Sequence, residues 1–315
     1  MSYCNSSGYL DSAEFLSMSL HYIGLFALPF QFFGAYCILL KTPPTMISVK
    51  WVLLNFHLWS CFVDFGMSWL TTPYIFFPTF SGYPLGALNL IGIATGDQTY
   101  FMLTVIGVAV VSIVGIFESR LLVLLAPSHF WRRLRAPWML FNFSIALFYC
   151  LPAYLRIPDQ EAAKAALLPL LPCVPDYVDV ERVFVFVLQV RWLLCPAAAA
   201  MLFFFSQILA CYLLTNAILV REYGKSVSER SVRLQRKFQK VLLFQLSIPF
   251  LIMFFPMIYV GMSTCLRYHS QAANNLALIT LSSHGFFSTI VMITIHQPYR
   301  SFLFSFWCHI GTRRN

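Results

Sequence analysis

Seven apolar runs of membrane-spanning length constrain this chain more than any other feature of its sequence. A helix rises about 1.5 Å per residue, so roughly 20 apolar residues cross the hydrocarbon core of a bilayer. The runs lack the two-residue alternation of barrel strands, and an open sheet would leave backbone groups unpaired in lipid. The sequence therefore predicts an all-α membrane protein, a single seven-transmembrane helix bundle over residues 1–315. The expected spans lie near 18–40, 51–77, 98–125, 138–155, 192–220, 238–262 and 273–295.

Composition agrees with a membrane-embedded chain. Hydrophobic residues make up 59% of it and charged residues only 10%, whereas an average soluble domain is about 25% charged. The net charge of +9 is expected to reflect the cytoplasmic loops of a membrane protein. The lipid bilayer, and no nucleic acid, is therefore the partner that the composition predicts.

The distribution of cations predicts how the bundle is oriented. Sixteen of the 21 Lys and Arg residues lie in the connections that follow the first, third, fifth and seventh runs. Because cytoplasmic loops are enriched in Lys and Arg, this asymmetry predicts an outer N-terminus and a cytoplasmic C-terminus. The sequence Asn-Ser-Ser at Asn5 matches the glycosylation sequon and lies on that predicted outer side.

Motifs of enzymes and of metal sites are absent from the sequence. It contains no HExxH, GxSxG, CxxC or P-loop pattern, and its seven histidines are scattered without ligand spacing. We therefore expect neither catalysis nor a metal or other cofactor. Cys4, Cys173 and Cys265 are predicted to face the oxidising side, where Cys4–Cys173 or Cys173–Cys265 could form a disulfide. The sequence leaves that pairing open.

Asp64 is the acid predicted to lie deepest in a span. It follows Lys50 by fourteen residues, which corresponds to about 21 Å of helix. Intramembrane charges are costly and usually face the interior of the bundle. One interpretation is a polar or ion-binding switch. The other is a protonated side chain that shares hydrogen bonds with Ser or Asn neighbours.

Glu118 and Arg120, in the sequence FESR at the end of the third span, form a second candidate site. Arg120 could pair with Glu118 in one state and release it in another, as a latch. The alternative is ordinary anchoring by an Arg that extends its charge to the membrane surface.

The segment 221–240 holds seven cations and two acids. Its second half is predicted to be a helix that extends the sixth span into the cytoplasm. The functional interpretation is a docking surface for a cytosolic partner, and the alternative is attraction to anionic lipids. The cations assigned to this surface are Arg230, Arg233, Arg236 and Lys237.

The sequence HQPYR, residues 296–300, follows the last span. Pro298 disfavours helix at the residue before it, so the chain is expected to bend at Gln297. His296, Pro298, Tyr299 and Arg300 are predicted to form the cytoplasmic end of the seventh span. By chemistry Tyr299 and Arg300 are interface anchors, and a hinge is the alternative.

Two further patterns concern local structure. Pro249 and Pro256 lie seven residues apart in the sixth span and are expected to kink it. Phe and Val alternate in 183–190, which predicts a short β-ribbon in an outer loop.

Four segments together resemble one receptor family. They are WVLLNFHLWSCFVDFGMSWLTTPYIFFPTFSGYPLGAL (51–88), FESR (117–120), LPCVPDYVDVERVFVF (171–186) and SHGFFSTIVMITIHQPYR (283–300). They are similar to segments of the nematode serpentine receptor class H chemoreceptors, with Ser119 in place of that family's Asn. The sequence has neither an Asp-Arg-Tyr nor an Asn-Pro-x-x-Tyr motif, and 97–103 contain no Cys. Activation details of rhodopsin-like receptors are therefore not transferred by position.

The resemblance implies a chemosensory G-protein-coupled receptor of the plasma membrane, in the cilia of sensory neurons. Such a receptor would bind a small external ligand among the third, fifth, sixth and seventh spans and activate a heterotrimeric G protein. The Phe, Tyr and Leu content of the outer half favours apolar or weakly polar ligands. The alternatives are a transporter or ligand-gated channel, and a receptor-like scaffold without coupling.

Overall fold

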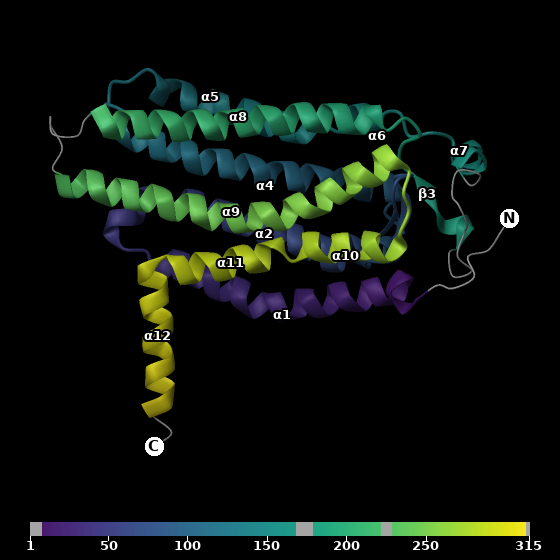
Figure 1. Cartoon of the computed structure of the whole chain (residues 1–315), viewed down its shortest axis with the longest axis horizontal. Helices are drawn as coiled ribbons and strands as arrows, with labels where there is room; N and C mark the ends of the chain where they lie inside the picture. Colours follow the sequence, from purple (N-terminus) through teal and green to yellow (C-terminus); the bar gives the residue numbers. More distant parts are fainter. Residues whose placement is uncertain (1–7, 168–178, 222–228, 313–315) are drawn as a thin grey trace.

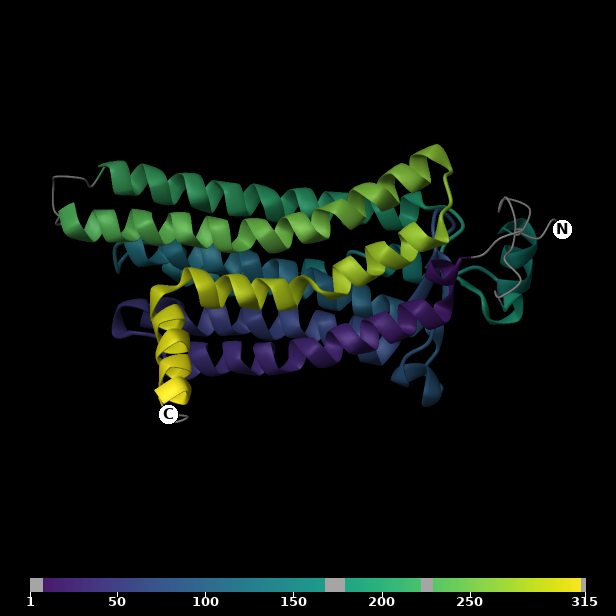
Figure 2. The same cartoon turned by 60° about the horizontal axis from the view of Figure 1, so that its bottom comes forward.

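The protein is a bundle of long helices that lie side by side along one axis (Figures 1 and 2). The computed structural model describes residues 8–167, 179–221 and 229–312. A small sheet and the start of the first helix lie at one end, which we call the sheet end. The last helix leaves the bundle at the other end, which we call the α12 end.

Ten of the described helices form the bundle and the helix that leaves it. They are α1 (Ala13–Leu40), α2 (Ile47–Phe65), α4 (Thr95–Leu124), α5 (Trp131–Phe148), α6 (Leu151–Tyr154), α8 (Arg191–Arg221), α9 (Glu229–Leu266), α10 (Gln271–Ser282), α11 (His284–Ile295) and α12 (Gln297–Thr312). Shorter helical pieces are Tyr9–Asp11, Pro44–Met46, α3 (Ala87–Leu90), α7 (Gln160–Leu167) and Val180–Arg182, and a π-helix at Gly66–Thr71 continues α2.

The predicted seven-helix bundle is confirmed. Within the described residues, six helical segments are long and apolar enough to cross a membrane: Ala13–Leu40, Thr95–Leu124, Trp131–Tyr154, Arg191–Arg221, Gln235–Leu266 and Gln271–Ile295. The remaining span is α2, which is more polar because it carries Asn55, His57 and Asp64. It packs against α1, α4 and α11, so its polar side chains face other helices.

Three predicted span boundaries were wrong. The second span ends at Thr71, and Pro73–Phe76 forms strand β1 instead of continuing to residue 77. The fourth begins at Trp131, seven residues before its predicted start, and is interrupted between α5 and α6. The seventh is broken at Ser283 into α10 and α11. At Pro73 the cause is local, because a proline without an N–H fits the first position of a strand.

A three-stranded antiparallel sheet covers the sheet end, and its first two strands were not predicted from the sequence. β1 (Pro73–Phe76) pairs with β2 (Ser81–Pro84), which pairs with β3 (Phe184–Val185). β3 lies in the predicted ribbon segment, but its partner comes from the loop after α2. The fully buried Tyr74 donates a hydrogen bond to the Asp11 carbonyl, 2.6 Å away, and so joins the sheet to the N-terminal segment.

Polar side chains from the start of α10 hold the sheet against the helices. Gln271 donates to the Ile75 carbonyl at 3.2 Å, and Asn275 donates to the Leu10 carbonyl at 2.8 Å. His269, just before α10, lies 2.6 Å from the Phe77 carbonyl. Buried backbone carbonyls of this end thus find partners outside the sheet ladder, as burial requires. The sheet is therefore held against the start of α10.

Candidate functional site

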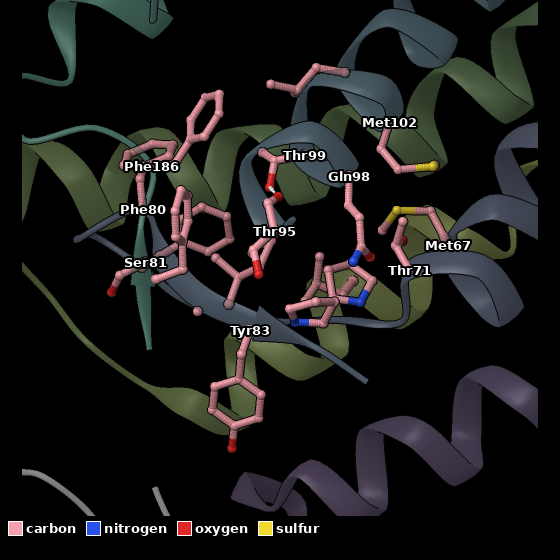
Figure 3. Close-up of a pocket in the computed structure, with 18 of the residues that line it drawn as sticks. Met67, Thr71, Phe80, Ser81, Tyr83, Thr95, Gln98, Thr99, Met102 and Phe186 are labelled. Atoms are coloured by element: carbon pink, nitrogen blue, oxygen red, sulfur yellow. Dashed lines mark hydrogen bonds between the residues drawn. The ribbon is translucent and has the colours of Figure 1, made fainter. Parts of the chain in front are cut away.

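A cavity of about 240 Å³ lies at the sheet end, between the sheet and the helices (Figure 3). It includes residues of the third, fifth, sixth and seventh spans, the four spans expected to enclose a ligand. The sheet and the π-helix contribute as well, which was not predicted. Its lining includes Met67 and Thr71 of the π-helix, Ile75 and Tyr83 of the sheet, Gln98, Thr99 and Met102 of α4, Leu193 of α8, Val260 of α9 and Leu278 of α10.

The cavity lining is mostly apolar and carries no ionised side chain. Among the described lining residues none is Asp, Glu, Lys, Arg or His. Burial raises the pKa of the Tyr83 phenol, although the guanidinium of Arg182, 5.1 Å from its ring centre, acts in the opposite sense. Tyr83 therefore stays protonated at physiological pH. The cavity is chemically suited to a neutral molecule, since a buried unpaired charge is very costly.

Asp64 lies deep in the bundle and binds backbone N–H groups at the break in the seventh span. Its carboxylate accepts hydrogen bonds from the N–H groups of Gly285 at 3.0 Å and Phe286 at 2.8 Å. It also accepts one from the Gln31 amide at 3.0 Å, and His284 Nδ1 lies 3.0 Å away. The first N–H groups of any helix lack partners within that helix. Asp64 of α2 therefore caps the N-terminus of α11 from another helix.

This arrangement bears on both interpretations of Asp64. The inward-facing polar packing is present, but the partners are Gln31, His284 and backbone N–H groups instead of Ser or Asn side chains. Gly285 makes the close approach possible. A Cβ at Gly285 would lie 2.6 Å from Asp64 Oδ2 and 2.7 Å from the Ser60 carbonyl oxygen. The break and the glycine together let a carboxylate reach the helix end.

Glu118 and Arg120 are both buried, but Glu118 forms its described ion pair with a different helix. Glu118 Oε2 lies 2.9 Å from Arg135 Nε, and Trp131 Nε1 donates to Glu118 Oε1 at 3.1 Å. Both partners belong to α5. The expected partner of Glu118 was Arg120, but residues two apart on a helix point in different directions. Glu118 thus joins α4 to α5.

Arg120 lies at the α12 end, where it acts on His296. It is 8% exposed and interacts electrostatically with His296. His296 Nε2 donates to Gln245 Oε1 of α9 at 2.7 Å. The structure therefore brings together the ends of the third, sixth and seventh spans, where the sequence placed HQPYR.

The HQPYR segment bends one residue earlier than predicted. His296 is extended, and Gln297 is already the first residue of α12, with Pro298 in its first turn. Figure 1 shows α12 running nearly perpendicular to the bundle. A proline in the first turn of a helix loses no hydrogen bond, which explains this placement.

Tyr299 is not an interface anchor, which corrects one interpretation of HQPYR. It is fully buried and lies in a cluster with Cys37, Ile38 and Met292. Its hydroxyl lies 2.8 Å from Thr42 Oγ1. Arg300 is exposed, as expected for a residue at the membrane surface.

The other predicted site residues are dispersed. Helix α9 begins at Glu229, which confirms the predicted helical extension of the sixth span. Arg233 and Lys237 are exposed there, and Arg236 is half-buried.

The Arg230 side chain, Asn5, Cys4 and Cys173 lie outside the described part of the structure. Cys265 is an exposed free thiol, so the described chain offers no support for its disulfide. In the same described residues no three His, Cys, Asp or Glu side chains gather as a metal site.

Several residues that build these sites were not singled out from the sequence. Gln98 of the cavity, Gln31 and His284 beside Asp64, and Gln245 beside His296 are polar residues in apolar runs. The Ser-His-Gly sequence at 283–285, in the middle of a span, was a usable signal for the break, because glycine and capping residues there disfavour a continuous helix.

Comparison with known proteins identifies the family of this chain. The family model described as "Serpentine type 7TM GPCR chemoreceptor Srh" matches residues 11–309. The chain is also 28% identical over 307 residues to "Serpentine receptor class H-72" of Caenorhabditis elegans, a match that covers 94% of this chain and 86% of that protein. With a seven-helix bundle, a cavity at one end and a family match along nearly its whole length, the chain belongs to the Srh family of serpentine seven-transmembrane chemoreceptors.

Proposed function

We propose that the protein is a chemosensory receptor that binds a small external molecule and activates a heterotrimeric G protein. The observation that carries this proposal is the cavity enclosed by the sheet and the ends of α4, α8, α9 and α10. Family membership supports a receptor role. The bundle crosses the plasma membrane, and family resemblance favours the cilia of sensory neurons. In this proposal the sheet end is outside, in agreement with the asymmetry of Lys and Arg.

The α12 end supplies the surface for the G protein. Arg233 and Lys237 are exposed at the start of α9, Arg233 just before the apolar segment Gln235–Leu266 and Lys237 within its first turn. Nearby, the hydrogen bond between His296 and Gln245 connects α11 to α9, and the buried Arg120 of α4 acts electrostatically on His296. Movement of α9 away from α11 would separate Gln245 from His296 and open a cleft beside α4. Figures 1 and 2 show that α9 is already bent along its length, as its prolines predicted.

A ligand must favour one of the two states to transmit a signal. The cavity contains Val260 near one end of α9 and Leu278 of α10. A molecule that fits between them only in the active arrangement would shift the population by its difference in affinity. Asp64 serves as a polar switch in this scheme, because α11 moves only if the Asp64 hydrogen bonds to Gly285 and Phe286 rearrange.

Separate Arg120→Ala and Glu118→Gln substitutions test the coupling contacts. We expect each variant to bind ligand normally and to need about tenfold more ligand for half-maximal G-protein activation, a typical size of allosteric coupling. The measurement is nucleotide exchange on purified G protein, in parallel with direct ligand binding. Arg191→Ala, which changes a cation at the sheet end, is the control and should leave activation unchanged.

Unaltered activation in both variants at normal surface expression would refute the coupling role of Glu118 and Arg120. A ligand response that persists in membranes without G protein would instead favour a ligand-gated channel. Ligand accumulation inside vesicles would favour a transporter.

A further inference from the structure

Gln98 places an unsatisfied hydrogen-bond acceptor in the wall of the cavity. Its side chain is 2% exposed, and its Nε2 donates to the Ile93 carbonyl at 2.8 Å. A carbonyl only accepts hydrogen bonds, so this contact fixes which end of the amide is nitrogen. The other end, Oε1, is buried and has no hydrogen-bond partner among the described residues. Figure 3 shows the Gln98 side chain extending from α4 among the other lining side chains.

Two hydroxyl groups beside Gln98 have already donated their protons. Thr99 Oγ1 donates to the Thr95 carbonyl at 2.8 Å, and Thr71 Oγ1 donates to the Gly66 carbonyl at 2.9 Å. Each hydroxyl has a single proton, so both can only accept further hydrogen bonds. The polar side of the cavity formed by Gln98, Thr71 and Thr99 therefore presents acceptors.

Size and charge restrict the occupant further. An apolar cavity of about 150 Å³ holds benzene, so a cavity of about 240 Å³ accommodates roughly ten non-hydrogen atoms by the same proportion. No ionised side chain lines it, as described above. Met67, Met102, Leu278 and Val260 provide an apolar surface around the polar side.

We propose that the ligand of this receptor is a small neutral molecule with an apolar body and one hydrogen-bond donor, an alcohol or a phenol, whose hydroxyl donates to Gln98 Oε1. This deepens the proposed function and rests on it for the physiological role. It makes Gln98 a specificity-determining residue. Acceptor-only molecules of equal size, such as ethers and ketones, leave Gln98 Oε1 unpaired, and leaving a buried acceptor unpaired is unfavourable.

Matched probes test this selectivity by direct binding. The receptor is purified in lipid nanodiscs, and binding is measured by equilibrium dialysis with no G protein present. One set is 1-octanol, 2-octanone and 1-methoxyheptane, which have the same number of non-hydrogen atoms. A second set is 2-phenylethanol with its methyl ether. We expect the alcohol of at least one set to bind about tenfold more tightly than its acceptor-only partners, the ratio that one hydrogen bond provides.

Gln98→Leu removes the acceptor and nearly preserves side-chain volume. It is expected to reduce the alcohol to the affinity of the ether, with ether binding unchanged within about twofold. Met102→Leu is the matched control, since it alters an apolar residue of the same helix and cavity and should change all probes equally. Thermal unfolding of both variants verifies that they are folded. If Gln98→Leu does not fold, Gln98→Glu serves instead: a protonated carboxyl group donates to the Ile93 carbonyl, keeps one acceptor oxygen and should retain the preference for alcohols.

The outcomes separate this proposal from the proposed function. Equal binding of alcohols and ethers, or no binding of any alcohol up to its solubility, overturns the proposal about Gln98. Selective binding of alcohols without any G-protein activation supports it and refutes the receptor function instead. Preference for the alcohol that persists in Gln98→Leu assigns recognition to another residue and overturns the role of Gln98.

Discussion

The Asp64→Ala receptor is expected to be largely absent from the cell surface and to unfold at a much lower temperature in detergent. The substitution leaves three donors without their acceptor, namely the N–H groups of Gly285 and Phe286 and the Gln31 amide. Each buried unsatisfied donor costs about 1–3 kcal/mol. The sum of about 3 kcal/mol or more is a large part of the total stability of a typical domain, about 5–15 kcal/mol.

Asp64→Asn is the matched control for this prediction. An amide oxygen still accepts, and Asn is a favourable residue at a helix N-terminus. It has one acceptor oxygen, whereas hydrogen bonds reach both oxygens of Asp64. We therefore expect an intermediate loss of stability. Surface labelling and thermal unfolding measure both variants, and an Asp64→Ala protein as stable as the parent would show that the cap is dispensable.

The second large effect is expected from Gly285→Ala. The new Cβ would lie 2.6 Å from Asp64 Oδ2 and 2.7 Å from the Ser60 carbonyl oxygen, so α11 must move away from α2. Overpacking of this kind costs about 1–3 kcal/mol, and the displacement also weakens the bonds between Asp64 and the start of α11. We expect a clear fall in surface expression and in unfolding temperature.

Gly261→Ala provides the control within the same protein. A Cβ at Gly261 of α9 has nothing within 4 Å. In open space alanine stabilises a helix by about 0.5–1 kcal/mol relative to glycine, so this variant should be as stable as the parent or slightly more so.

Combining Gly285→Ala with Asp64→Ala gives a second check, because residues in contact do not contribute additively. The steric conflict with Asp64 is gone in the double variant, so its loss should be less than the sum of the two. Strict additivity would contradict the proposed contact.

Local sequence properties predicted the helix bundle but few of the side-chain contacts between its helices. Each span depends on the hydropathy of about 20 consecutive residues, which can be read directly from the sequence. The hydrogen bond between Asp64 and Gly285, by contrast, joins residues 221 positions apart, and nothing near Asp64 specifies it. The sequence predicted that Asp64 faces inward, and only the packing of α2 against α11 identifies its partners.

Glu118 shows how helix geometry decides which charges can pair. Opposite charges at positions 118 and 120 were paired because they are close in sequence, yet helical neighbours are three or four residues apart. The observed partner, Arg135, lies on the next span. Its identity depends on the turn between α4 and α5, which hydropathy does not encode.

The sheet was missed for a different reason. Residues 73–77 are as apolar as a span, so composition extended the second helix through them. They are buried under the N-terminal segment and α10 instead of in lipid. A cavity does lie among the four spans expected to enclose a ligand, but the sheet that covers it was not predicted.

The polarity of α2 also has a consequence for how the protein is made. A segment that carries Asn55, His57 and Asp64 enters a bilayer unfavourably by itself, because each polar side chain must leave water without a partner. The preceding helix α1 supplies two such partners, since Gln31 donates to Asp64 and its carbonyl accepts from His57. During synthesis α2 is thus best retained in the membrane as a hairpin with α1. The two hydrogen bonds between Gln31 and α2 would then form first, at the translocon, before α11 is synthesised.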